Sequence, residues 1–381
     1  MNKCIIIIMV VCLTVSCTHN KTSLSIGPGV VSLSSPQDVI VEMTGETYDK
    51  LETILQQVSY VKLSAIPLLS RIKKIQIADE RIYLWDLVVG IVCYDMSGEL
   101  LFQLNARGQG PGEYTDINAF AVNASLHQLV IYDNMKQSLM FYSTEDGRFV
   151  KSEKFNKPTP AEIAYWGGYF FYHNRLHRNY QDDISLHYYL LASKDGITIG
   201  KRYFKHENNK EDYPFSPSGH NLYDNNSKLY YCRDFDNIHE DSVVPRFRIN
   251  LPNPLPASMI EERPNEMSLL RSGYSLGITD IYEYGGLLFF RFVKDGYIWS
   301  CLYNVEESKQ VYCAKRIKFL DSSLIDTIDG IYKDCFYSIL TPEYLDYAFS
   351  ENPLEDYPDL FKTYDVEGDN PVIAFYRAVV R

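Results

Sequence analysis

A glycine-rich loop at residues 107–114 is the first part of the sequence whose residue types could do chemistry. It reads Arg-Gly-Gln-Gly-Pro-Gly-Glu-Tyr. Successive backbone N–H groups in such a loop can form a concave anion site. However, Pro111 has no N–H group and no Gly-Lys-Ser/Thr sequence follows, so the pattern of a nucleotide-binding loop is absent. A tight turn that needs glycine is the favoured interpretation. The candidate ligand-binding side chains are Arg107, Gln109, Glu113 and Tyr114.

A second motif, Gly-Tyr-Ser-Leu-Gly at residues 273–277, matches the nucleophile elbow of α/β-hydrolases. In that fold the catalytic histidine follows the serine along the chain. Here the last histidine is His239, which precedes Ser275, and residues 278–284 continue as a strand rather than a helix. The match is explained by turn glycines, and no catalytic residue is predicted.

Metal-ligating side chains are present but lack the spacing of known sites. His173 and His177 are four residues apart with no carboxylate between them, whereas zinc needs at least a third protein ligand. Two acidic clusters, at residues 234–241 and 365–369, lack the spacing of an EF-hand. No metal and no cofactor are predicted.

The cysteines leave one pairing open. Five of the eight follow residue 17, and none forms a Cys-x-x-Cys motif. Cys301 and Cys313 flank residues 304–309, where a symmetric hairpin would place them opposite each other on two strands. In an oxidising compartment they could form a disulfide, and the sequence does not decide whether they do.

The N-terminus has the features of an export signal. A positive start at residues 1–3 precedes an apolar run at 4–15, which is shorter than the roughly 20 residues of a membrane-spanning helix. Residues 13–17, Leu-Thr-Val-Ser-Cys, resemble a bacterial lipobox, which predicts lipidation of Cys17. We therefore expect a lipoprotein signal peptide at 1–16, a tether at 17–35 and a folded domain at 36–381.

The charge of the chain excludes one class of partner. The formal net charge is −12, with no run of five or more basic residues. Such a surface repels the phosphate backbone of nucleic acids and does not attract anionic lipid headgroups. We expect no nucleic-acid partner, and membrane attachment only through the lipid anchor.

The elements that carry these residues are predicted to be strands in repeated units. Residues 82–86 (Ile-Tyr-Leu-Trp-Asp) and 91–95, followed by a Ser-Gly turn, are echoed by residues 129–133 (Leu-Val-Ile-Tyr-Asp) and 139–142, followed by an Asp-Gly turn. Asp86 and Asp133 are 47 residues apart, the length of a four-stranded propeller blade. With weaker copies near residues 169–191, 229–249, 287–303 and 372–376, the chain is predicted to be an all-β, six-bladed propeller.

Two further expectations concern the ends and the insertions. The strand at residues 39–42 and the terminal strand near Val372 are expected to complete one blade together, since propellers remove open sheet edges in this way. Residues 258–272 and 342–364 interrupt the strand pattern and predict short helical or irregular insertions.

The strand-turn-strand unit at residues 92–101, the loop at 107–114 and the ending Asp-Asn-Pro-Val-Ile at 369–373 carry a family resemblance. They resemble the six-bladed β-propeller lipoproteins of Gram-negative gut bacteria, over roughly residues 36 to 381. The resemblance implies a propeller fold and location at the cell envelope, as an outer-membrane lipoprotein whose membrane face is left open. It implies no particular activity.

The predicted function is therefore that of a ligand-binding or scaffold propeller. The 31 tyrosines suit recognition of a glycan or peptide ligand as well as blade packing, and an envelope protein is a third partner class. The alternative is a carbohydrate-active enzyme, a glycoside hydrolase or lyase, with paired carboxylates at the propeller channel.

Overall fold

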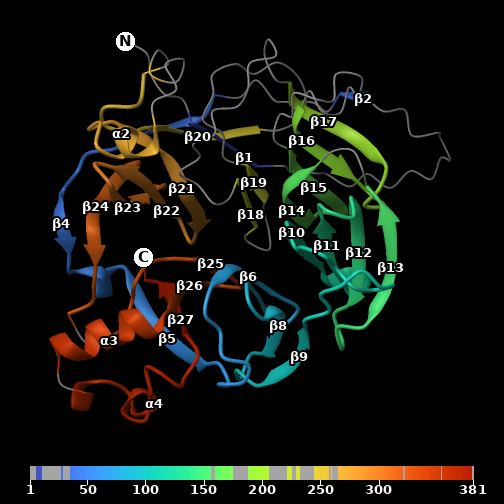
Figure 1. Cartoon of the computed structure of the whole chain (residues 1–381). Helices are drawn as coiled ribbons and strands as arrows, with labels where there is room; N and C mark the ends of the chain where they lie inside the picture. Colours follow the sequence, from blue (N-terminus) through green and yellow to red (C-terminus); the bar gives the residue numbers. More distant parts are fainter. Residues whose placement is uncertain are drawn as a thin grey trace. The chain divides into compact units, whose positions relative to one another are not determined.

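The structure is a computed structural model of the whole chain (Figure 1). It describes residues 6–10, 27–28, 35–155, 159–174, 188–205, 221–224, 229–231, 244–256, 259, 265–320, 322–352 and 354–379. The chain divides into two compact units, and each is described by itself. The first contains Met1–Val41, Arg107–Asp280 and Phe292–Gly296, and the second contains Glu42–Ala106, Ile281–Arg291 and Tyr297–Arg381.

The first unit contains three sheets. One is a four-stranded antiparallel sheet of β10 (Ala119–Asn123), β11 (Gln128–Asp133), β12 (Ser138–Ser143) and β13 (Phe149–Lys154). The next has the order β14 (Pro160–Trp166), β15 (Tyr169–Asn174), β16 (Tyr188–Ser193), β17 (Ile199–Lys205) and β2 (Gly27–Pro28). The third has the order β18 (Leu222–Asp224), β19 (Leu229–Tyr231), β1 (Ile6–Val10), β20 (Val244–Asn250) and β3 (Gln37–Ile40).

The second unit contains two complete sheets and most of a third. The complete sheets are β6 (Ile72–Ala78), β7 (Arg81–Asp86), β8 (Gly90–Asp95), β9 (Leu100–Leu104), and β25 (Gly330–Tyr332), β26 (Cys335–Leu340), β27 (Val372–Ala378), β5 (Leu55–Lys62). The third has the order β21 (Ser275–Tyr284), β22 (Leu287–Lys294), β23 (Tyr297–Asn304), β24 (Lys309–Ile317) and β4 (Gly45–Tyr48). The division between the units runs through β21 and β22.

Burial follows the strand position within each blade. The second and third strands of the repeated blades, β7, β8, β11 and β12, are buried at nearly every residue, so both of their faces are covered. Their continuous runs of β-branched and aromatic residues are typical of strands buried on both sides. The fourth strand is different, because β13 is exposed along almost its whole length. The hydrophobic runs found in the sequence therefore mark the middle of each blade.

The repeated aspartates have the same structural role in two blades. Asp86 ends β7 and Asp133 ends β11, and both side chains are fully buried. Each carboxylate accepts backbone N–H groups from the segment before the first strand of its blade and from the turn after its second strand. The donors are Ser70, Arg71, Val88 and Val89 for Asp86, and Thr115 and Lys136 for Asp133. The aspartate recurs in the sequence because the same hydrogen-bond network recurs in the two blades.

The chain is all-β with a β-propeller arrangement of sheets, but the prediction of six blades is wrong. Five sheets contain four neighbouring blade strands each, and in one of them the fourth strand, β5, comes from the start of the domain. The sixth takes only β18, β19 and β20 from the expected blade, and β1 lies between β19 and β20. The link between β19 and β20, residues 232–243, lies outside the described part of the chain. In four of the five complete blades the four strands follow one another along the chain, and the fifth blade joins β25, β26 and β27 to β5.

The strand that pairs with the end of the chain also differs from the prediction. β27 is antiparallel to β5, with Ile373 opposite Val61, so the blade that joins the two ends of the domain uses residues 55–62. The strand near Val39 instead runs parallel to β20, with Val39 opposite Ile249. Both segments are short and contain apolar residues, and the sequence pattern does not say which of them is the partner.

The two predicted insertions are confirmed as short helices. The first contains α2 (Glu266–Leu270), and the second contains α3 (Pro342–Glu351), a 3₁₀ turn at Leu354–Asp356 and α4 (Asp359–Lys362). Thr341 precedes α3 and its side-chain oxygen accepts the N–H of Tyr344 at 3.3 Å, an N-cap, with proline at the first helical position. No helix in the described part of the chain is long and apolar enough to cross a membrane.

Candidate functional site

The glycine-rich loop of residues 107–114 is held closed by its own hydrogen bonds. Gly108 donates its N–H to the carbonyl of Tyr114 at 2.9 Å. The Glu113 carboxylate accepts the N–H of Gly110 at 2.8 Å, and the Glu113 N–H bonds the Gly110 carbonyl at 3.2 Å. Three of the backbone N–H groups that an anion nest could use are therefore already bonded within the loop.

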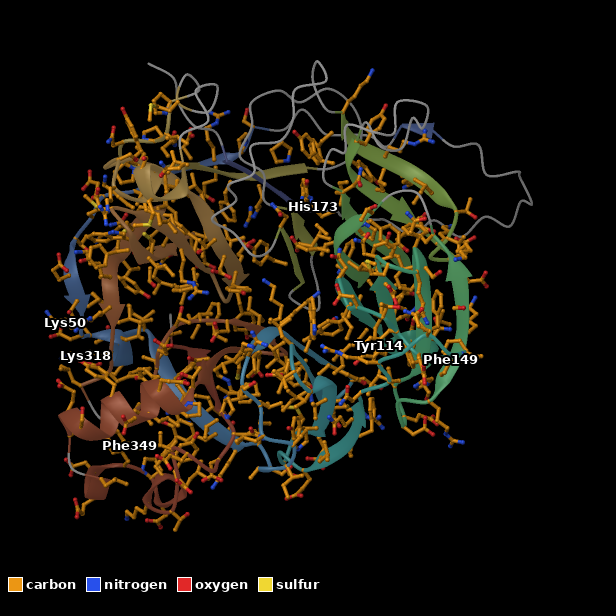
Figure 2. The ribbon with its side chains drawn as sticks, viewed as in Figure 1. Lys50, Tyr114, Phe149, His173, Lys318 and Phe349 are labelled. Atoms are coloured by element: carbon orange, nitrogen blue, oxygen red, sulfur yellow. The ribbon has the colours of Figure 1, made fainter. Side chains whose placement is uncertain are left out.

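Neighbouring strands also fix this loop from outside. Lys136 donates to the carbonyl of Glu113 at 2.5 Å, and the Tyr142 hydroxyl donates to the carbonyl of Gly112 at 3.1 Å. Gly112 has a φ of +77°, and a Cβ there would lie 2.8 Å from the Phe149 ring, so only glycine fits. Figure 2 labels Phe149 and Tyr114 in this part of the first unit. The loop is a tight structural turn, as its sequence indicates.

The four predicted binding residues lie together in this loop but are not equally accessible. Tyr114 is completely buried, and Glu113 is half-buried with its carboxylate bonded to Gly110. Arg107 and Gln109 are exposed. Ligand binding by these residues stays a prediction, with Arg107 and Gln109 as the two that solvent reaches. Cys17, the predicted lipidation site, lies outside the described residues.

Replacing Glu113 by alanine is expected to lower the free energy of unfolding by about 1–2 kcal/mol, because the half-buried Gly110 N–H loses its acceptor. Glu355, an exposed glutamate outside the loop, is the matched control, and Glu355→Ala is expected to change stability by less than about 0.5 kcal/mol. Urea unfolding followed by tyrosine fluorescence measures both. Equal stability of the two variants would show that the loop does not need the carboxylate.

Ser275 does not have the environment of a nucleophile. It begins β21, is buried, and its hydroxyl donates to the carbonyl of Pro252 at 2.5 Å. The residues after it continue as the ten-residue strand β21, as the sequence predicts, and not as a helix. The Gly-x-Ser-x-Gly match is a strand start.

The histidine and acidic clusters form internal contacts. The His173 ring nitrogen Nδ1 lies 3.0 Å from the Tyr231 hydroxyl, and His173 is buried, whereas His177 and residues 234–241 lie outside the described part. The Asp369 carboxylate accepts the N–H of Asp365 at 2.8 Å and pairs with Lys62 at 2.6 Å. Among the described residues, no group of three or more His, Cys, Asp or Glu residues could hold a metal ion.

A pocket in the second unit has more solvent-accessible polar and charged side chains than the loop does. Its volume is about 680 Å³, within the range of small-molecule sites. The end of β24, the segment that follows it and α3 form its walls. The lining residues are Thr47, Lys315, Arg316, Ile317, Lys318, Phe319, Leu320, Ser322, Ser323, Leu324, Ile325, Asp326, Tyr344, Tyr347, Ala348, Glu351, Asn352 and Tyr357. Figure 2 labels Lys318, the first residue after β24.

Tyrosine hydroxyls hold the pocket walls to one another. The Tyr344 hydroxyl on α3 donates to the carbonyl of Ile325 at 2.8 Å and accepts its N–H at 3.2 Å. The Tyr357 hydroxyl donates to the carbonyl of Ala348 at 3.0 Å, near the end of α3. The Tyr344 bonds join α3 to the segment that follows β24, and the Tyr357 bond holds the insertion together, so the pocket is preformed and does not depend on an isolated helix. The Tyr347 side chain, in contrast, is 51% exposed and available to a ligand.

The pocket carries charges of both signs. Lys315 is already engaged, because it pairs with Glu46 at 2.9 Å and lies 4.1 Å from the centre of the Tyr297 ring. Arg316 and Lys318 are exposed, and within the described residues no carboxylate forms an ion pair with either. Asp326 and Glu351 provide two carboxylates in the same lining. The two cationic groups can therefore bind an anionic group of a ligand. The two carboxylates can accept hydrogen bonds from hydroxyl groups of a ligand.

Asp326 is the pocket carboxyl with a perturbed acidity. Protein atoms crowd the carboxylate although part of the side chain is accessible through the pocket, and this desolvation raises the pKa of Asp326, with Arg291 opposing the shift. Burial raises the pKa of the Tyr344 hydroxyl too, and the charge of Asp326 adds to that effect. Perturbed groups of this kind are frequent in functional sites.

Sequence reasoning missed this pocket, although two of its parts had a signal. Residues 315–318 read Lys-Arg-Ile-Lys in an acidic chain, and residues 342–364 were recognised as an insertion. The lining extends from Thr47 to Tyr357, and only the fold brings these residues together. The run and the insertion are separated by about 25 residues of unremarkable sequence.

Comparisons with known proteins agree with the fold. The chain matches a protein family described as a domain of unknown function, DUF4934, over residues 38–377. A crystal structure from Bacteroides fragilis NCTC 9343, whose description proposes an exported protein, has a TM-score of 0.69 at 16% identity and covers 91% of this chain and 100% of that chain. A DUF4221 family member from Bacteroides vulgatus ATCC 8482 has a TM-score of 0.47 at 10% identity, with 87% and 100% covered. A comparison with curated protein sequences gave no match.

The sequence identity and the length of chain matched decide what each similarity establishes. At 16% identity the Bacteroides fragilis structure supports the fold alone. The family match, by contrast, spans almost all of the folded part, from β3 to β27. The chain therefore belongs to the DUF4934 family, a family whose function is unknown.

Proposed function

We propose that this protein is a cell-envelope lipoprotein, anchored through Cys17, that binds an acidic oligosaccharide in the pocket between β24 and α3. The lipobox-like sequence at residues 13–17 and the Bacteroides fragilis relative, described as exported, support the location. The resemblance to the propeller lipoproteins of gut bacteria supports it too. The function rests on one observation, the pocket that presents Arg316 and Lys318 beside exposed tyrosine and carboxylate groups.

The composition of the lining favours a saccharide. Two thirds of the lining residues have side chains that form hydrogen bonds, and these match the many hydroxyl groups of a sugar. The exposed ring of Tyr347 offers an amphipathic face on which a pyranose can pack. A volume of about 680 Å³ accommodates a few sugar units.

The charges favour a ligand that carries an acid group. The chain has a net charge of −12, and the pocket nevertheless presents two cationic side chains that form no ion pair with any described carboxylate. Arg316 can bind a carboxylate or sulfate with two parallel hydrogen bonds, and Lys318 adds a second positive charge. Asp326 and Glu351 can accept bonds from the hydroxyl groups of the same ligand.

A binding screen of the mature chain tests this proposal. Residues 17–381 with Cys17→Ser, which prevents lipidation, are applied to an array of acidic oligosaccharides, their neutral counterparts and acidic peptides. We expect binding to acidic oligosaccharides that weakens with salt, because the cationic groups are accessible to solvent. Binding to peptides alone, or equal binding to neutral and acidic sugars, would contradict the proposal.

A carbohydrate-active enzyme is the second candidate, and one observation favours it. Asp326 and Glu351 line the same pocket, a pair of carboxyl groups as glycosidases use, and burial shifts the pKa of Asp326 upward, the direction that favours a general acid. If the protein is a glycosidase, Asp326→Asn is expected to lower kcat by about 10²–10⁴-fold on a bound oligosaccharide. If wild-type protein leaves the ligand intact after prolonged incubation, binding is the function.

If the protein binds the ligand without cleaving it, Asp326→Asn is expected to have a different effect. Because the pKa of Asp326 is raised, its charge is lost as the pH falls through a value above that of an ordinary aspartate, and its repulsion of an acidic ligand is lost with it. The affinity for the ligand is therefore expected to rise as the pH falls. Asp326→Asn should bind about 5-fold more tightly than wild type at pH 7 and without this pH dependence. Calorimetric titrations at several pH values measure it, with the exposed Asp116→Asn as control.

A further inference from the structure

The hairpin of β23 and β24 places two buried cysteines directly opposite each other. Cys301 on β23 is the register partner of Cys313 on β24, as the symmetry of the hairpin sequence predicts. Both residues are fully buried in the second unit, and both are thiols in this structure. Each of the other two described cysteines faces an aromatic residue, since Cys93 lies opposite Tyr83 and Phe102, and Cys335 opposite Tyr332.

The hydrogen bonds of Cys313 show which kind of cross-strand pair this is. The Cys313 carbonyl accepts the N–H of Thr44 at 2.9 Å, and the Cys313 N–H donates to the Thr44 hydroxyl at 2.9 Å. The N–H and carbonyl of one strand residue point to the same side, so both backbone groups of Cys313 are directed away from β23. Cys301 and Cys313 therefore form a non-hydrogen-bonded pair, in which Cα atoms are about 4.5 Å apart and side chains approach most closely.

This geometry suits a disulfide. A Cα separation of about 4.5 Å lies within the range of natural disulfides, whose Cα atoms are about 4.4–6.8 Å apart. The Cys313 side chain also lies close enough to contribute to the raised pKa of the Cys301 thiol. Cysteines at such a Cα separation can be bridged without large backbone movement.

We infer that Cys301 and Cys313 are joined by a cross-strand disulfide when the protein matures in an oxidising compartment. The Sγ–Sγ bond forms as the two thiols lose two protons and two electrons. The oxidant is a protein or small-molecule disulfide, which is reduced to two thiols in the exchange. The inference rests on the hairpin alone and does not depend on the pocket or its ligand.

The reaction belongs to folding rather than to the folded protein. Burial raises the pKa of the Cys301 thiol well above its ordinary value, and the neighbouring Cys313 thiol adds to this, so the native thiol is almost never a thiolate. Exchange needs the thiolate, and it also needs access to the oxidant. The bond is therefore made while the hairpin is still open, and once folded it is protected from reductants.

Peptide mapping of the full chain tests the inference. Trypsin cuts after Lys294, Lys309 and Lys315, so Cys301 lies in peptide 295–309 and Cys313 in peptide 310–315. From protein exported to an oxidising periplasm, we expect these two peptides to be linked without reductant and separate after reduction. Alkylation of both cysteines in unreduced, denatured protein, or linkage of either one to another cysteine, would overturn the inference.

A stability measurement supplies a second readout that needs no substitution. Protein folded with the disulfide is expected to melt roughly 5 °C higher than the same protein folded under reducing conditions, because the bond closes a loop of about 13 residues in the unfolded chain. Dithiothreitol added to native protein should not reduce the bond until urea unfolds the hairpin. Equal melting temperatures, or rapid reduction of the native protein, would count against a buried disulfide.

Discussion

Replacing Asp86 by alanine is expected to lower the free energy of unfolding by about 4 kcal/mol. The Asp86 carboxylate accepts four backbone N–H groups at 2.5–3.0 Å, and the side chain is fully buried. Without it, these donors lose a charged acceptor, and a donor left buried without a partner costs about 1–3 kcal/mol. Denaturant unfolding of the full chain measures the change, with the exposed Asp116→Ala as the matched control at less than about 0.5 kcal/mol.

The pH dependence of this effect provides an internal check. Burial alone would raise the pKa of Asp86, but the four N–H bonds outweigh it and hold the pKa below its ordinary value. A depressed pKa means that the stabilisation is present above the pKa of the unfolded chain and is lost as the pH falls through the folded value. The difference between wild type and Asp86→Ala should therefore narrow in acid. A constant difference would show that packing, and not the carboxylate charge, stabilises this turn.

Reversing the charges of Arg316 and Lys318, which form no ion pair with any carboxylate in the described part of the chain, is expected to have the largest effect on binding. The double variant Arg316→Glu, Lys318→Glu should bind an acidic oligosaccharide at least about 100-fold more weakly, since two attractions become repulsions and each tenfold loss corresponds to about 1.4 kcal/mol. Both side chains are exposed, so the fold should be unaffected. Calorimetric titration at low and moderate salt measures the loss.

A matched variant separates a local from a general charge effect. Lys73 and Lys309 are exposed lysines of the same unit that do not line the pocket, and replacing both by glutamate changes the net charge equally. This control is expected to change affinity by less than about threefold. A similar loss in the two double variants would mean that the overall charge of the protein, and not the pocket, determines affinity.

The sequence predicted the local structure well where one pattern had one physical cause. Asp86 and Asp133 recur because the same carboxylate closes the same turn in successive blades, so the repeat length and the blade strands could be inferred together. The position of Cys301 directly opposite Cys313 in the strand register could be predicted from the symmetry of a single hairpin. In each case the contacts that matter lie within one blade.

Predictions that depended on the choice between distant segments were less successful. The strand near Val39 and β5 are both short segments with several apolar residues, and only the tertiary structure shows that β5 belongs to the terminal blade. The sixth blade was expected from weak copies around residues 229–249, but the described part of the sheet there includes β1 between β19 and β20. Hydrophobic periodicity specifies that a strand is buried and leaves open what it pairs with.

The candidate site was the least predictable part for the same reason. The loop at residues 107–114 is rich in glycine because its backbone requires glycine, as Gly112 shows. This composition is visible in the sequence, so the loop could be predicted as a candidate site. The pocket is built from ordinary residues, such as Lys318 and Tyr347, that become a site only when β24 and α3 meet. The proposed function therefore depends on residues that the fold brings together and not on a sequence motif.

A crystal structure of the mature chain with the tightest acidic oligosaccharide from the screen tests the central claim most directly. The account predicts the sugar in the pocket, its acid group within about 3 Å of Arg316 or Lys318 and a ring against Tyr347. Electron density for the sugar at the loop of Arg107 and Gln109, or anywhere else on the protein, with the pocket holding only water, would contradict it.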